Sequence, residues 1–312
     1  MLEALPKAMF SLLASSGTLK SLASRYGLRA PTGFARRFIA GETIDDAIAA
    51  AHEIHRAGLD VTLDHLGESV ATREGATLAT RAYISAIDAI VHSSISRNLS
   101  IKLTQLGLDI DKATSLDNLR RVLDAAGHAS VFVRIDMEGS AYTDLTLDTF
   151  ETLWSIGYRD VGVVLQSSLK RTPADLERVL RLGGRVRLVK GAYREPRDVA
   201  FHHKRDVDAA FVELMRILLR RSTRPAIATH DPAMIDSTRT FAAQHSVAPE
   251  TFEFQMLYGI RRDLQTMLSR NGYTVRIYVP YGREWFPYFM RRLGERPANV
   301  TFVIKSLMRE KN

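Results

Sequence analysis

Short apolar runs recur along the chain from residue 58 onward, and segments with the 3.6-residue period of a helix separate them. Each run has the β-branched and aliphatic composition that is typical of a buried strand. The runs cover residues 58–64, 99–105, 130–136, 160–166, 185–191, 224–230, 251–257 and 274–280. Alternating strands and helices predict a parallel sheet with right-handed crossovers. Eight such units in about 220 residues favour a closed (β/α)8 barrel of the TIM type over an open doubly wound sheet.

The segment before the first strand lies outside this repeat. We therefore expect a helical N-terminal extension over residues 1–57 and a barrel catalytic domain over residues 58–312. Thr43 is the expected N-cap of a helix, since acidic residues follow it in the first turn. The stretch Ala8 to Ala14 predicts an amphipathic helix that docks on another helix, another subunit or a membrane surface. Glu3 in the would-be positive region argues against a signal peptide.

The composition excludes several classes of chemistry. The chain has 312 residues and no cysteine, so disulfides, cysteine-based zinc sites, thiol nucleophiles and iron–sulfur clusters are ruled out. The formal net charge of +8 favours anionic ligands. No basic stripe with interleaved aromatic residues is present, so we expect no nucleic-acid binding. The HEIHR segment places its second histidine one position too early for the zinc motif H-E-x-x-H, and we expect no metal.

Polar residues follow at nearly every predicted strand end. The carboxyl ends of barrel strands meet at one mouth, where ligands bind. Polar side chains at equivalent places in the repeat are therefore expected to converge on one cavity. These residues are Asp64, Lys102, Asp136, Gln166, Lys190, His230, Gln255 and Tyr278.

A helix is expected near Pro287, after the last strand, because proline suits the first turn of a helix. Its residues Tyr288, Arg291, Arg292 and Glu295 have the spacing i, i+3, i+4 and i+7, so they share one face. Two hypotheses follow for this face. It either presents the arginines to a ligand at the mouth, or it is a solvated face with an Arg291–Glu295 pair.

The mouth is more basic than acidic, which suits a carboxylate or phosphate ligand. Three reaction classes fit the residues. One is a Schiff-base aldolase with Lys102 or Lys190 as nucleophile. The second is a metal-dependent hydrolase, and the third is a redox enzyme with a bound organic cofactor. The hydrolase would use His65, Asp136, His230 and Asp231. Residue chemistry alone leaves the aldolase and the cofactor enzyme both open.

Several motifs, in order, resemble those of one family. They are DHLGE, SIKLTQLG, VRIDMEGS, VVLQSSLKRT, VRLVKGAY, ATHD, FEFQML, VRIYVPYG and YFMRRLGER, within residues 34–305. The chain resembles the FAD-dependent proline dehydrogenases, which exist as short bacterial enzymes and as a domain of bifunctional proline-utilisation flavoproteins. The bifunctional proteins commonly have Trp after VKGAY, whereas this chain has Arg194, as in the short monofunctional type.

The resemblance implies a distorted (β/α)8 barrel whose last helix lies over the mouth. It implies that Lys102, Arg291 and Arg292 bind the carboxylate of L-proline, and that Glu68 pairs with Arg291 when the site is empty. Arg187 would reach the flavin N5 region, and Asp136 would orient Lys102 or take part in proton handling. Three residues would enclose the pyrrolidine ring: Tyr278, Tyr288 and Leu257. Eight would contact FAD: Met137, Gln166, Arg187, Lys190, Gly191, Ala192, Thr229 and His230.

The implied reaction is oxidation of L-proline at C5 to Δ1-pyrroline-5-carboxylate, which hydrolyses to glutamate semialdehyde. The reduced flavin would pass its electrons to a quinone. The resemblance also implies a separate pyrroline-5-carboxylate dehydrogenase downstream. We expect a cytoplasmic protein, and the basic surface favours transient contact with the inner face of the membrane.

Overall fold

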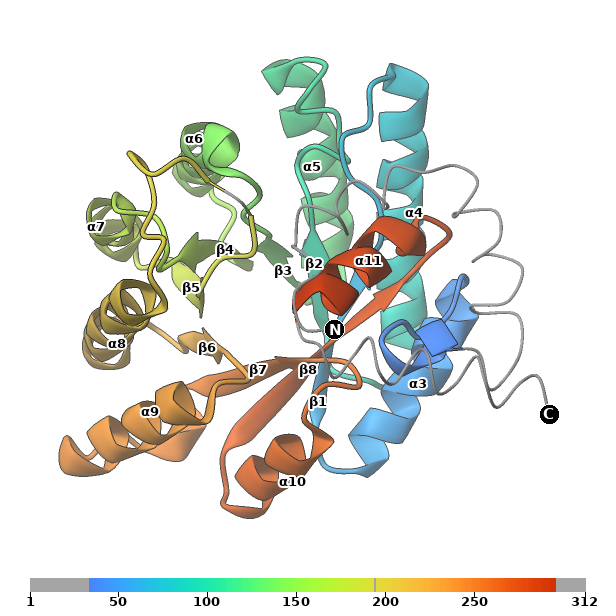
Figure 1. The fold of residues 1–312 in the computed structure, drawn as a ribbon. Coiled ribbons are helices and arrows are strands. Elements are labelled where there is room, and N and C mark those ends of the chain that lie inside the picture. Colours follow the sequence, from blue (N-terminus) through green and yellow to red (C-terminus); the bar gives the residue numbers. More distant parts are fainter. Residues whose placement is uncertain (1–33, 194, 296–312) are drawn as a thin grey trace, which may run out of the picture.

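The computed structural model describes residues 34–193 and 195–295, and its strands form one closed parallel barrel in the order β1 to β8 (Figure 1). All of the strands predicted from the apolar runs are present, and the predicted barrel is confirmed. Their bounds are β1 Asp60–His65, β2 Asn98–Ile101, β3 Phe132–Ile135, β4 Val161–Gln166, β5 Arg185–Val189, β6 Ala226–Ala228, β7 Glu253–Leu257 and β8 Thr274–Tyr281.

Helices surround the barrel, and the connections carry short 3₁₀ turns (Figure 1). Their hydrophobic faces meet the outer surface of the strands, so most strand residues are covered on both sides of the sheet. The helices are α3 Ile44–Arg56, α4 Arg73–His92, α5 Lys112–His128, α6 Thr143–Ser155, α7 Thr172–Leu182, α8 Lys204–Arg221, α9 Pro232–Gln244, α10 Arg262–Arg270 and α11 Trp285–Glu295. The 3₁₀ turns are η1 Phe34–Arg37, η2 Ser140–Tyr142 and η3 Pro249–Thr251.

The helix before the first strand belongs to the outer ring. Thr43 caps α3 as predicted, and Asp46 completes the reciprocal capping box by accepting from the Thr43 backbone N–H. Its apolar face, which includes Ala47 and Ile54, is buried in the main core. α3 contacts both β8 and β1, and these two strands pair with each other over the whole length of β1. It therefore fills the position between the last and first strands that the eighth outer helix takes in a regular barrel.

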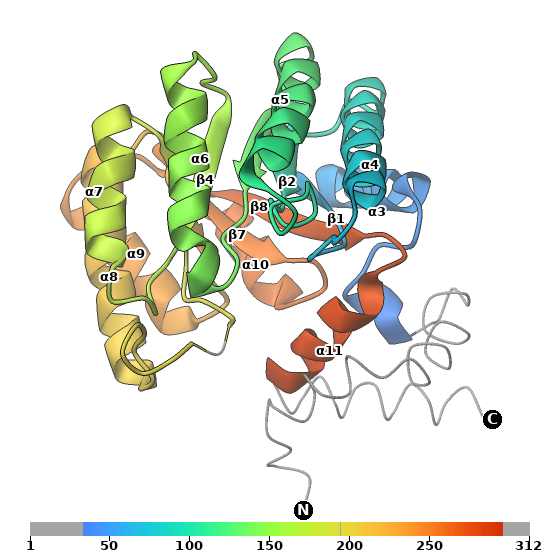
Figure 2. The same ribbon diagram turned by 90° about the horizontal axis from the view of Figure 1, so that it is seen from above.

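The last helix has a different place, at one end of the barrel and apart from the outer ring (Figure 2). A second apolar cluster joins it to the segment around η1, where the rings of Phe38 and Phe289 lie 6.2 Å apart. The Trp285 Nε1–H donates to Glu42 Oε1 at 3.3 Å. Because Tyr288 and Arg292 are buried, at 7% and 9% exposure, the hypothesis of a solvated face is wrong.

Two of the sequence predictions fall outside the described residues. They concern the amphipathic helix around residues 8–14 and the branch-specific Arg194. Among the residues that the structure does describe, no helix has both the length and the apolar character needed to cross a membrane.

Candidate active site

A cavity of about 450 Å³ opens at the carboxyl ends of the strands, beneath α11. This volume lies within the usual range of small-molecule and cofactor sites. Every residue predicted for catalysis, substrate binding or cofactor binding lines it. The structure thus brings together residues that lie up to 190 positions apart in the chain, from Lys102 to Arg292. Tyr193 and Asp64 line it as well.

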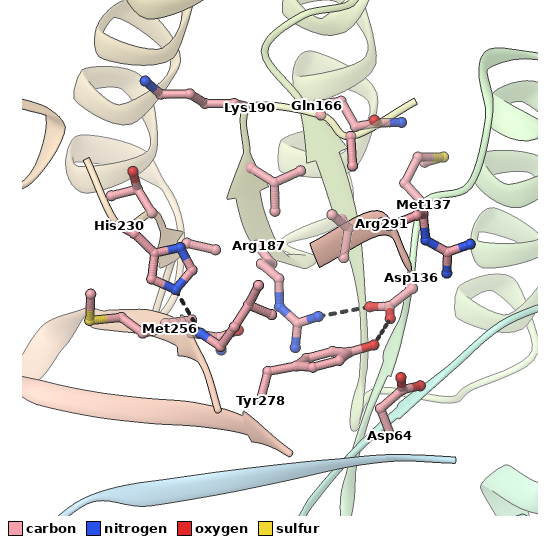
Figure 3. Close-up of a pocket in the computed structure, with 18 of the residues that line it drawn as sticks. Asp64, Asp136, Met137, Gln166, Arg187, Lys190, His230, Met256, Tyr278 and Arg291 are labelled. Carbon is pink, nitrogen blue, oxygen red and sulfur yellow. Dashed lines mark hydrogen bonds and ion pairs between the residues drawn. The ribbon is translucent and has the colours of Figure 1, made fainter. Parts of the chain in front are cut away.

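Asp136 is the centre of a hydrogen-bonded cluster in this cavity (Figure 3). Arg187 Nη1 donates to Asp136 Oδ1 at 2.7 Å, and Tyr278 Oη donates to Oδ2 at 2.6 Å. The guanidinium of Arg187 lies 5.3 Å from the centre of the Tyr278 ring. Burial, and then the Asp136 charge, raises the pKa of Tyr278 well above its usual value. The phenol is therefore a neutral donor at physiological pH.

Lys102 is held mainly by Asp64, a residue predicted at the mouth but not among the predicted site residues. Its Nζ lies 2.8 Å from Asp64 Oδ1 and 3.8 Å from Asp136 Oδ2. Burial lowers the pKa of Lys102, but the two carboxylates outweigh burial and raise it well above its usual value. A Schiff-base nucleophile must be neutral, so this environment does not favour Lys102 as an aldolase lysine.

Lys190 belongs to a cluster with two carboxylates and a second lysine. Its Nζ lies 2.7 Å from Asp231 Oδ2 and also contacts Asp208, and both carboxylates contact Lys204. Asp231 is also the N-cap of α9, accepting from the Ala233 N–H. Burial alone would raise the pKa of Asp231. The hydrogen bonds from Lys190 and Lys204 outweigh burial and lower that pKa to about 2. Asp208 and Lys204 come from α8, and no motif in the sequence indicated this contact.

His230 has a defined protonation pattern. The Leu257 backbone N–H donates to His230 Nε2 at 2.9 Å, so that nitrogen carries no proton and the proton of the neutral ring lies on Nδ1 (Figure 3). The lone pair of Nε2 is therefore occupied by this backbone hydrogen bond. Across the described ranges, no group of three or more His, Asp or Glu side chains is arranged to hold a metal ion. The hydrolase hypothesis thus finds no ligand set in this part of the chain.

The backbone at Gly191 approaches the cavity in a conformation that favours glycine. Its φ is +107°, and a Cβ there would lie 2.3 Å from Ser168 Oγ. Gln166 is oriented by its Nε2–H, which donates to the Glu138 carbonyl at 2.9 Å. The Glu138 carboxylate is buried and accepts from Thr104 Oγ1 at 2.6 Å, a role that the sequence did not reveal. The small residues Gly191 and Ala192 both line the cavity here, so a ligand can approach the backbone closely at this edge.

The two arginines of α11 occupy different environments. Arg291 Nη1 donates to Glu68 Oε1 at 2.7 Å, so the predicted pairing of Glu68 with the first helix arginine is confirmed. Arg291 is only half-buried, whereas Arg292 is buried with its guanidinium 5.0 Å from the centre of the Tyr288 ring. Both side chains line the cavity from the side opposite the strands.

A family model described as proline dehydrogenase matches residues 47–305. The chain belongs to the proline dehydrogenase family. Proline dehydrogenase 1 of Bacillus subtilis (strain 168) is 40% identical over 302 residues, which cover 97% of this chain and 99% of that protein. Proline dehydrogenase of Deinococcus radiodurans is 40% identical over 279 residues, covering 88% of this chain and 90% of that protein.

Proline dehydrogenase domains of larger proteins have the same fold. The crystal structure of proline utilization A from Bdellovibrio bacteriovorus, inactivated by N-propargylglycine, matches with a TM-score of 0.78 at 26% identity. The match covers 83% of this chain and 32% of that one, so this chain spans about a third of the solved protein. The near-complete coverage of the Bacillus relative confirms the resemblance to the short monofunctional type.

Proposed function

We propose that this protein oxidises L-proline to Δ1-pyrroline-5-carboxylate, the first step of proline degradation to glutamate. One observation carries the proposal. A single cavity combines three cationic side chains for a carboxylate, Lys102, Arg291 and Arg292, with the hydrogen-bonded Arg187–Asp136–Tyr278 cluster. Relatives that share nearly the whole chain are named proline dehydrogenases.

The substrate carboxylate would bind between α11 and the end of β2. Two guanidiniums and one ammonium offer several charge-assisted hydrogen bonds to its oxygens. Arg291 would give up Glu68 for the substrate, while Arg292 is already buried at the cavity. The rings of Tyr278 and Tyr288 and the side chain of Leu257 would enclose the pyrrolidine ring, which excludes water from C5.

The residues present fit FAD as the cofactor. Gly191 and Ala192 offer close approach to the backbone, and Arg187 Nε is buried with no hydrogen-bond partner among the described residues. The FAD contacts proposed are Met137, Gln166, Arg187, Lys190, Gly191, Ala192, Thr229 and His230. Bound FAD would supply the acceptor for the hydride that leaves C5.

The side chains of the cavity would have two tasks in the reaction: to accept one proton and to stabilise the developing negative charge. The ring nitrogen must lose its ammonium proton so that its lone pair forms the C5=N bond while the C5–H bond breaks. Asp136 is the carboxylate that we propose for this proton handling, with Arg187 and Tyr278 fixing its two oxygens. Arg187 would also stabilise the negative charge that develops as the hydride is transferred.

The cellular setting completes the proposal. Electrons would pass to a quinone, the protein would be cytoplasmic with transient contact at the inner face of the membrane, and a separate dehydrogenase would consume the product. The barrel of residues 58–312 would be the catalytic domain, with residues 1–57 as a helical extension whose α3 completes the outer ring.

The test is spectroscopic. The purified protein should carry a yellow flavin band, and L-proline should bleach that band and drive reduction of a dye acceptor without added NAD. Absence of proline-dependent bleaching in flavin-reconstituted protein would refute the proposal. Trapping of a carbonyl substrate on a colourless protein by borohydride would instead support the aldolase.

A further inference from the structure

Lys102 has two carboxylate neighbours, and they are not equivalent. Asp64 Oδ1 lies 2.8 Å from its Nζ, which is a hydrogen bond, whereas Asp136 Oδ2 lies 3.8 Å away. Both oxygens of Asp136 already accept short bonds, from Arg187 and from Tyr278. Asp136 is thus committed to the Arg187 side of the cavity, and of these two carboxylates it is Asp64 that hydrogen-bonds the ammonium.

The barrel register explains this pairing. Asp64 in β1 is the partner of Ser100 in β2, and Lys102 follows Ser100 by two residues. Residues two apart on a strand point to the same side, so Lys102 and Ser100 both face the barrel interior. Ser100 Oγ accepts from Arg187 Nη2 at 3.0 Å, which confirms the inward direction. Asp64 therefore meets Lys102 at the inner wall, one strand away.

The burial of Asp64 is costly for the fold. The residue is 0% exposed, and its Oδ2 has no hydrogen-bond partner among the described residues. A buried ion pair often contributes less to stability than apolar residues of the same volume would. The half-satisfied carboxylate is therefore poorly explained by folding alone.

We propose that Asp64 is a positioning residue that holds the Lys102 ammonium where it meets the substrate carboxylate. This inference rests on the proposed function, and it divides the work between two carboxylates. Asp64 acts through Lys102 on substrate affinity, and Asp136 acts with Arg187 and Tyr278 on the redox side. Asp64 Oδ1 is occupied by the Lys102 ammonium, so we assign Asp64 a role through Lys102 and not through a hydrogen bond of its own to the substrate.

The test combines Asp64→Asn with a direct measure of carboxylate binding. Tetrahydrofuran-2-carboxylate serves as the probe, since it carries the carboxylate and the ring without an amine. Its dissociation constant, measured by calorimetry, and the KM for proline should both rise by about 10- to 100-fold. We expect kcat to change by less than about threefold and the flavin-to-protein ratio to be unchanged, because Asp64 acts on binding.

A double-mutant cycle separates positioning from a general effect. In a Lys102→Met background, Asp64→Asn should raise the probe's dissociation constant by less than about threefold, because Asp64 then has no ammonium to hold. A full repeat of its effect in that background would overturn the proposal. So would an unchanged dissociation constant in the single variant.

Glu253→Gln is the matched control. Glu253 is a barrel carboxylate at the opposite end of the strands, 3.0 Å from Arg276, and it does not line the cavity. Its loss should lower Tm without changing KM. Asp64→Ser removes the same charge and leaves room for a water molecule. It carries the same expectation and takes the place of Asp64→Asn if the asparagine variant does not fold.

The binding measurement keeps the two proposals distinguishable. A wild-type protein that binds the probe but does not oxidise proline would refute the proposed function, while the Asp64 variants would still decide the positioning role. A wild-type protein that does not bind the probe would overturn both.

Discussion

The two α11 arginines should differ in how much catalysis loses when each becomes lysine. Lysine keeps the positive charge but cannot reproduce the planar fork that gives a carboxylate two parallel hydrogen bonds. For buried Arg292 the loss should be about 2–4 kcal/mol of transition-state binding, or about 30- to 1,000-fold in kcat/KM. Its 9% exposure means that water does not replace the missing bond.

Arg291 should lose less. Its 2.7 Å contact with Glu68 is present before substrate binds, so Arg291→Lys weakens the resting pair as well as the substrate contact. These two losses partly cancel in kcat/KM. Both side chains of that pair are about one-third exposed, where solvent screens ion pairs. We therefore expect a smaller loss for Arg291→Lys, of about 1–3 kcal/mol or about 5- to 150-fold.

The assay is proline-dependent dye reduction, with flavin content and inhibition by tetrahydrofuran-2-carboxylate measured on the same preparations. Flavin content should be retained, and inhibition should weaken in parallel with kcat/KM, since the arginines bind the carboxylate. Arg283→Lys is the control, because Arg283 is exposed just before α11 and does not line the cavity. Near-normal kinetics in both variants, or a larger loss at Arg291 than at Arg292, would refute this reasoning.

Further substitutions test the flavin site, the backbone at Gly191 and the protonation of His65. Arg187→Ala should reduce flavin retention or reactivity, whereas Lys102→Ala should keep the flavin-to-protein ratio and mainly raise KM; the reverse result would exchange these assignments. Gly191→Ala should lower flavin content and Tm, because φ is +107° and its Cβ would meet Ser168 Oγ at 2.3 Å. His65→Gln should lessen the fall in Tm between about pH 7.5 and pH 5. Burial lowers the pKa of His65, so the unfolded chain binds that proton more readily and wild-type stability is lost as pH falls below about 6.5; an identical pH profile in both proteins would contradict this.

The strands were predictable because a parallel barrel strand is buried on both faces. β4, for example, is buried at every residue, and this forces an uninterrupted apolar run in the sequence. The mouth residues followed from the same rule, since a polar residue at the end of such a run must lie where the core stops. The i, i+3, i+4 spacing predicted that the arginines of α11 share one face. Whether that face meets a ligand or solvent could be predicted only from the resemblance to the proline dehydrogenases.

The pairings inside the site were much harder to predict. Lys102 has two acidic neighbours at strand ends, Asp64 and Asp136, and spacing along the chain does not rank them. Their order depends on strand register and on the other bonds that Asp136 accepts. The contact of Lys190 with Asp208 depends on how α8 packs against the barrel, which is a tertiary property. The place of α3 between β8 and β1 likewise depends on barrel closure.

The position of α3 has a consequence for the order of events during synthesis of the protein. α3 leaves the ribosome before any of the barrel strands, but part of its docking surface is β8, which begins more than 200 residues later, at Thr274. At a translation rate of about 5–20 residues per second, α3 waits roughly 10–45 s for that partner. Its apolar face is without its final cover throughout this interval. β8 must therefore leave the ribosome before the barrel closes, and a nascent chain stalled before Thr274 exposes this face to chaperones.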